Sequence, residues 1–128
     1  MRRVILDNED KKYIQKQFLI YSLGIVNGIQ YKIIDSKKES SLLLFRPDVI
    51  VWLVKNNFSQ EFIDIMNKGY KIGQVANEAP DYFSTYINEL AQLILLELSK
   101  LQGIEIIKPF GVDIMDIISN ESLLSNIK

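Results

Sequence analysis

The sequence predicts an α+β fold in which a small antiparallel sheet packs on a layer of helices. Two β-rich segments, 29–35 and 42–45, flank the polar run "SKKESS", which is typical of a hairpin. A long run with helical periodicity follows at about 82–102, so helices are grouped in the second half. At 128 residues the chain has the size of one domain, and we expect a single domain over 1–128.

The N-terminal third is predicted to contain a strand, a helix and the hairpin. "RRVIL" forms the short strand. The helix begins near Asn8, which can cap it, carries Ile14 and Phe18 on one face, and ends at Gly24. "IQYKIID" and "LLLF" then pair as the hairpin over about 29–46.

The stretch "SLLLFRPDVIVWLV" has two interpretations. Its β-branched residues favour one buried strand. Pro47, however, has a φ that suits the first turn of a helix, and Asp48 suits the positive end of a helix dipole. We favour a strand that stops and a helix that starts, on which Val49 and Trp52 share a face.

Residues 59–79 have near-helical spacing, with Ser59 as a cap. Gly69 and Gly73 lie four residues apart and so on the same face, where they would let another backbone come close. A phosphate-binding loop would need a Gly-Lys-Ser/Thr ending after a strand, which this segment lacks. We therefore predict that Gly69 and Gly73 are structural glycines.

The longest predicted helix covers about 82–102, after a break at Pro80 and before Gly103 at the C′ position. A strand at 104–108 follows and would complete the sheet. The helix is apolar on more than one side, so it is either central to the fold or shared with a second chain. The candidate residues of a homodimer interface are the leucines off its main stripe, Leu93, Leu95 and Leu96.

The composition excludes several classes of chemistry. There is no cysteine and no histidine, so disulfides, thiol nucleophiles, the usual zinc sites and histidine acid–base steps are absent. We identify no nucleophile, base or cofactor-binding loop. We therefore predict that the protein is not an enzyme and has no catalytic residues, metal or cofactor. No signal peptide or membrane span is recognised, which predicts a cytoplasmic protein.

The segment "IGQVANEAPDYFSTYINEL" resembles a helix-turn-helix, so a winged-helix transcriptional regulator is one alternative. Its charge argues against it. From Ile72 to Ser99 the sequence has four acidic residues and no lysine or arginine. Phosphate neutralisation supplies most of the affinity for DNA, so a nucleic-acid partner is not expected.

Aromatic residues are concentrated in the middle of the chain. They form either an ordinary core or an apolar cavity with a few polar contacts, the usual make-up of a small-molecule pocket. The candidate ligand-binding residues are Phe45, Trp52, Phe62, Tyr70, Phe83 and Tyr86.

Three pieces of the sequence, "LLLFRPDVIVWL", "GYKIG" and "LAQLILLELSKLQGIEII", resemble the 4-vinyl-reductase-type domain and the related N-terminal sensor domains of aromatic-responsive bacterial regulators. The resemblance covers roughly residues 29–108. It implies a strand ending at Phe45, a helix beginning at Pro47, and an α+β fold similar to that of transport-protein-particle subunits. It also implies dimers that bind small apolar ligands. The C-terminal cysteines that hold a metal in many family members are missing here.

The sequence therefore predicts a non-enzymatic domain that binds a small apolar or aromatic ligand, forms a homodimer and acts on a separate protein partner. The first alternative is a small protein–protein interaction or scaffold subunit of the same fold. The winged-helix regulator is the second.

Overall fold

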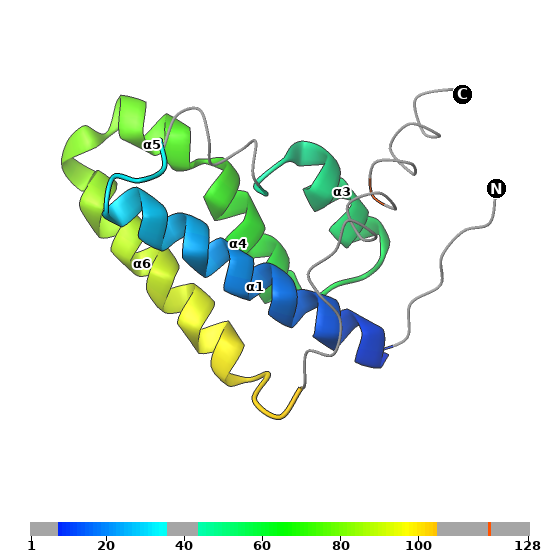
Figure 1. Ribbon diagram of the computed structural model, residues 1–128. Helices are drawn as coiled ribbons and strands as arrows, with labels where there is room; N and C mark the ends of the chain where they lie inside the picture. The colour runs from blue at the N-terminus through cyan, green and yellow to red at the C-terminus, as the bar shows by residue number, and fades with distance from the viewer. Residues whose placement is uncertain (1–7, 36–43, 105–117, 119–128) are drawn as a thin grey trace, which may run out of the picture.

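The computed structural model describes residues 8–35, 44–104 and 118. The helices with described bounds are α1 (Asn8–Gln30), α3 (Pro47–Lys55), α4 (Gln60–Tyr70), α5 (Ile72–Glu78) and α6 (Pro80–Ser99) (Figure 1). Helix accounts for 79% of these residues, and no strand or sheet occurs among them. The α+β fold class is therefore wrong, and with it the fold that the 4-vinyl-reductase-type resemblance implied. "RRVIL" and residues 105–108 of the last predicted strand lie outside the described residues.

Helix α1 runs six residues past Gly24, where the sequence predicted its end. Gly24 costs about 1 kcal/mol relative to alanine in a helix interior. Beyond it, Ile25, Val26 and Ile29 are buried and continue the stripe begun by residues nearer the N-terminus. Burying each of these side chains contributes about 1.5–3 kcal/mol, which outweighs the cost of one glycine.

The first strand of the predicted hairpin is in fact the end of α1 and its cap. Lys32 has a left-handed backbone with φ of 60°, and its N–H donates to the Ile29 carbonyl at 3.0 Å. The N–H of Ile33 donates to the Gly28 carbonyl at 2.8 Å. This pair of bonds is a Schellman motif, which satisfies carbonyls that the helix leaves free. Ile34 folds back so closely on Gly28 that a Cβ there would overlap its side chain.

Helix α3 begins at Pro47, as the sequence predicted. Arg46 is extended and its guanidinium forms an ion pair with Asp48, with Nε donating to Oδ1 at 2.9 Å. The hydrogen bond from Arg46 lowers the pKa of Asp48 below its ordinary 3.8. Val49 and Trp52 are buried on one face, as expected. Residues 44–54 contain no strand, so neither the single buried strand nor a strand ending at Phe45 forms among them; residues 41–43 lie outside the described residues.

The 59–79 segment is two helices, because the chain turns at Lys71 between α4 and α5. Ser59 caps α4 as predicted, its Oγ accepting from the Phe62 N–H at 3.4 Å. Gly69 is buried in α4, and the ring of Phe45 lies where its Cβ would be. The close approach at Gly69 is therefore made by an aromatic side chain instead of the expected backbone. Gly73 is half-buried in α5.

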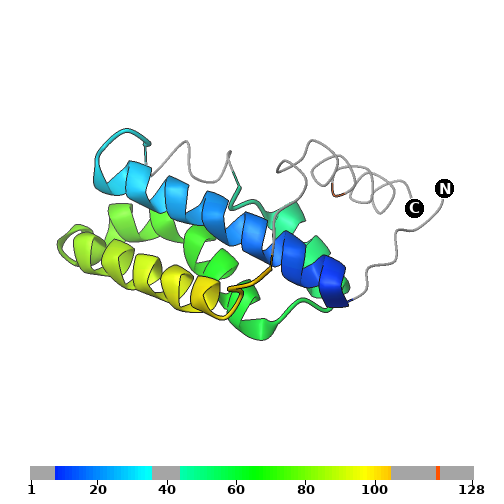
Figure 2. The same cartoon turned by 60° about the horizontal axis from the view of Figure 1, so that its bottom comes forward.

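Helices α1 and α6 run side by side in opposite directions, as both cartoon views show (Figures 1 and 2). Helix α6 also packs on α4 and α5, and α3 packs on α4. A chain of aromatic contacts crosses the core: Trp52–Phe58 at 5.6 Å between centroids, Phe58–Phe62 at 5.9 Å and Phe62–Phe18 at 6.1 Å. Because α6 lies at the edge of this arrangement, one side of it is left without a neighbouring helix among the described elements.

Candidate functional site

Helix α6 has an inward and an outward side, and both carry large aliphatic residues. The buried residues of α6 are Ile87, Leu90, Ala91, Ile94 and Glu97. They recur every three or four residues and face α1, α4 and α5, as the helical period requires. Leu98 is half-buried against the same core, whereas Leu93, Leu95 and Leu96 are exposed to solvent.

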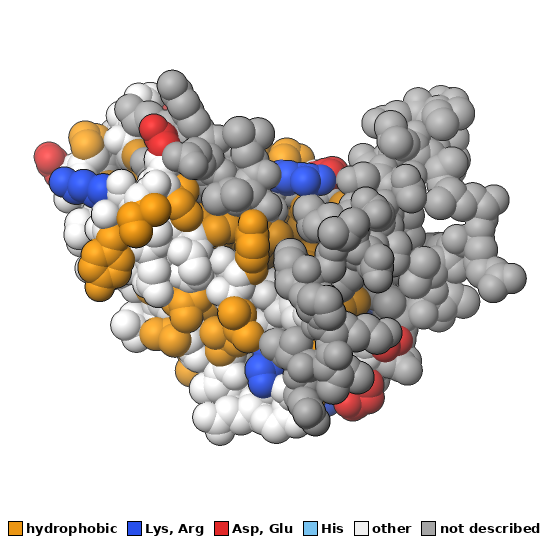
Figure 3. Space-filling model, viewed as in Figure 1, with side chains coloured by type: hydrophobic (Ala, Val, Ile, Leu, Met, Phe, Trp, Pro, Cys, Tyr) orange, Lys and Arg blue, Asp and Glu red, His pale blue; other side chains and the backbone are white. Residues whose placement is uncertain are grey.

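The outward side carries a shallow hollow of about 520 Å³. We call its lining the α6 face, which consists of Thr85, Asn88, Glu89, Gln92, Leu93 and Leu96. Leu93 is 36% exposed and Leu96 is 55% exposed. Figure 3 shows hydrophobic side chains at the surface over the part of the molecule where Figure 1 places α1 and α6. Two leucines three residues apart on a helix meet each other, so they form one apolar patch.

A tyrosine orients the carboxylate of the α6 face. The hydroxyl of Tyr82 donates to Oε2 of Glu89 at 2.9 Å, one helical heptad further along. This hydrogen bond raises the pKa of Tyr82 above its ordinary value of 10, because the phenolate could not donate it. One turn on, the hydroxyl of Tyr86 donates to the Lys68 carbonyl at 2.6 Å and ties α6 to the end of α4.

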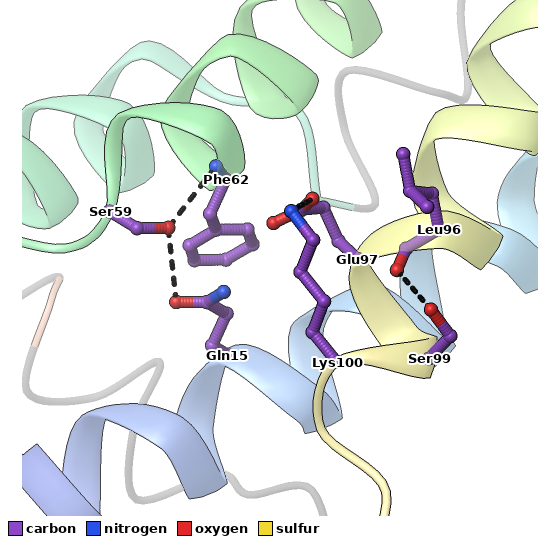
Figure 4. A network of polar contacts seen from close by, with 7 residues as sticks. All are labelled: Gln15, Ser59, Phe62, Leu96, Glu97, Ser99 and Lys100. Carbon is purple, nitrogen blue, oxygen red and sulfur yellow. Dashed lines mark hydrogen bonds and ion pairs between the residues drawn. The ribbon is translucent and has the colours of Figure 1, made fainter.

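The α6 face is acidic. No lysine or arginine occurs between Ile72 and Ser99. The next base, Lys100, donates from Nζ to Oε2 of the buried Glu97 at 2.6 Å (Figure 4). This hydrogen bond raises the pKa of Lys100. Lys100 is therefore already engaged, and the carboxylate of Glu89 has no described lysine or arginine as a hydrogen-bond partner.

A second hollow lies between the end of α1 and the start of α6. Its volume is about 830 Å³, and we call it the α1–α6 groove. Nε2 of Gln30 donates to Oδ1 of Asn88 at 2.7 Å across it. Its lining is Ile29, Gln30, Lys32, Ile33, Ile34, Asp35, Phe83, Ser84, Ile87 and Asn88. Asn88 belongs to both hollows, so they adjoin on the surface of α6.

The six aromatic residues predicted to bind a ligand do not gather around one hollow. Phe45, Trp52 and Phe62 are buried in the core. Phe83 is half-buried and lines the α1–α6 groove. The other two lie elsewhere: Tyr86 bonds to α4 and Tyr70 is exposed. The periodicity that marked the first three as apolar is equally typical of packing, which is the role the structure gives them.

The three leucines predicted as an interface are divided between two surfaces. Leu93 and Leu96 belong to the α6 face, whereas Leu95 is 46% exposed but lies outside its lining. Sequence reasoning missed Glu89 and Tyr82, although their seven-residue spacing on a helix was a signal that could have paired them. It also missed Gln30, because that residue was assigned to a strand.

No cluster of side chains that could bind a metal ion occurs in the described part of the chain. No three carboxylates there come together in a way that could hold a metal ion. Within the same residues, none of the helices combines the length and the hydropathy needed to cross a membrane. The cytoplasmic location stays a prediction.

Residues 9–109 match the model of a family described as "Protein of unknown function (DUF3969)". The matched region includes the whole α6 face and the whole α1–α6 groove. Comparisons with curated proteins and with solved structures gave no match. The resemblance to 4-vinyl-reductase-type domains stays a prediction.

Proposed function

The chain belongs to the DUF3969 family of proteins of unknown function, and from this premise we propose that it is a non-enzymatic interaction module that docks a protein on its α6 face. The observation that carries the proposal is the exposure of Leu93 and Leu96 in one hollow, on a side of α6 that none of the described helices covers. This corresponds to the scaffold alternative of the sequence analysis.

The energetic argument concerns these two leucines. Burying a leucine side chain contributes about 1.5–3 kcal/mol, so a partner that covered both would gain several kcal/mol of affinity before the costs of association. Apolar anchors surrounded by polar residues are the usual arrangement of a protein interface, and Thr85 and Gln92 supply polar neighbours here. The missing lysines and arginines argue against nucleic acid as the occupant.

The test uses two matched variants of neighbouring leucines. Leu96→Glu places a charge in the α6 face, while Leu95→Glu places the same charge on the same helix outside that face. We would measure self-association by sedimentation and capture of cellular proteins by cross-linking, after circular dichroism shows that both variants fold. We expect Leu96→Glu to abolish a complex that Leu95→Glu retains. The proposal fails if no complex depends on Leu96, or if both variants lose it equally.

The α1–α6 groove favours a second candidate function, the binding of a small apolar ligand. Phe83 and Ile87 supply apolar walls, and the amides of Gln30 and Asn88 could orient a polar group. A thermal-shift screen with aromatic and aliphatic ligands tests this candidate. We expect a stabilising ligand whose effect is lost in Phe83→Ala and retained in Tyr70→Ala. A ligand that stabilises all three proteins equally, or no ligand at all, contradicts it.

A further inference from the structure

Resting on the proposed function, we infer that the occupant of the α6 face is an amphipathic helix carrying a lysine or arginine opposite Glu89. Three features of α6 support this partner over a second copy of the chain: the spacing of the exposed residues, the charge of the face and the position of the Glu89 carboxylate.

The spacing along the outward side is that of a helix-pairing seam. Tyr82, Glu89, Leu93 and Leu96 follow one another at intervals of seven, four and three residues, whereas Tyr86 is half-buried and bonds to α4. Such intervals keep side chains in line when a second helix packs alongside at a shallow angle. At about 1.5 Å per residue the seam is about 20 Å long, which a partner helix of four turns would cover.

The charge of the seam selects the partner. Glu89 stands in its middle, between Tyr82 and the leucines. A second copy that docked through the same helix would bring another Glu89 and no base from Ile72 to Ser99, and its Lys100 already pairs with its own Glu97. Covering an uncompensated carboxylate costs affinity, and like charges brought together across an interface cost more. A lysine or arginine of the partner helix opposite Glu89 removes both costs.

The carboxylate of Glu89 is positioned to accept such a side chain. Tyr82 donates to Oε2, which places the carboxylate beside the Tyr82 hydroxyl on the exposed surface of the helix. A carboxylate has about four acceptor sites, so one hydrogen bond leaves room for a lysine or for an arginine with two N–H donors. Tyr82 is itself 46% exposed beside it, and its ring offers a face to the same cation.

The experiment uses a set of synthetic peptides of about 20 residues, each an amphipathic helix with a leucine stripe and one variable central position on the stripe. The central residue is lysine, arginine, glutamine or glutamate, and binding to the full chain is measured by fluorescence anisotropy. We expect the lysine and arginine peptides to bind about tenfold more tightly than the glutamate peptide. Glu89→Gln should remove this preference, and Glu89→Lys should reverse it.

The controls separate the failure of this inference from the failure of the proposed function. If the peptides bind regardless of central charge, and Leu96→Glu but not Leu95→Glu abolishes binding, the interaction face stands and the basic partner is wrong. If the chain forms a dimer that only Leu96→Glu dissolves, a second copy occupies the face, and again only the inference falls. If no peptide binding depends on Leu96 and no dimer forms, both are wrong.

Discussion

The inward and outward sides of α6 both carry large aliphatic residues, and these residues have opposite environments. Ile94 is fully buried against the bundle, whereas Leu96, two residues on, is 55% exposed. Helix α6 therefore carries more apolar surface than its contacts with α1, α4 and α5 use. The buried residues of the inward side stabilise the fold. The exposed leucines of the outward side do not, so the fold alone gives no reason for their presence.

The largest expected effect is a direct test of this comparison. Ile94→Ala should lower the free energy of unfolding by about 2–4 kcal/mol, because it leaves a cavity in a packed core. Leu96→Ala should change it by no more than about 0.5 kcal/mol, because the side chain is mostly in solvent. Urea unfolding followed by circular dichroism measures both. Equal losses in the two variants would mean that the outward side is packed after all.

Two glycines extend the comparison to other helices. Gly69→Ala should destabilise the protein by about 1–3 kcal/mol, because the new Cβ would overlap the ring of Phe45. Gly24→Ala adds the same methyl group where no atom lies within 4 Å, and should stabilise the protein by about 0.5–1 kcal/mol through helix propensity. The midpoints of thermal unfolding should move in opposite directions. A shift of the same sign in both would contradict the packing described at Gly69.

The smallest effect concerns the partly exposed ion pair at the start of α3. Asp48→Asn should cost about 0.5–1 kcal/mol at pH 7, the range for such a pair. Its hydrogen bond with Arg46 lowers the pKa of Asp48 below 3.8. The stabilisation is therefore fully present above the unfolded-state pKa and is lost as the pH falls through the folded-state value.

Urea unfolding from pH 7 down to pH 2 checks this dependence. The difference between the wild type and Asp48→Asn should shrink towards zero at the acid end, and Arg46→Gln should behave in the same way because it breaks the same pair. A difference that persisted undiminished at pH 2 would exclude the carboxylate as its source.

Local signals predicted several helix boundaries correctly. Pro47 begins α3 and Ser59 caps α4, since each acts on backbone groups within one turn, whereas α6 begins at Pro80, two residues before the predicted start. The prediction of a hairpin over 29–46 was wrong because its signal did not depend on local backbone groups alone. The alternation of "IQYKIID" fits a strand as well as it fits a helix end with a reversed cap, and only packing against α6 distinguishes them.

The candidate site was predictable in part. The excess of leucines on α6 was visible in the sequence and led to Leu93 and Leu96, which line the α6 face. The prediction of one aromatic pocket failed, because burial in a core and contact with a ligand require the same apolar side chains. Phe45 and Phe62 could be assigned to the core only once α4 was placed against its neighbours.

The sequence by itself determined where α3 and α4 begin, which residues are apolar, and that the segment from Ile72 to Ser99 carries no base. Only the tertiary structure decided that no sheet forms among the described residues, and which side of α6 meets solvent. The physical reason is that capping and charge act over a few residues, whereas burial depends on surfaces that the chain brings together from distant positions.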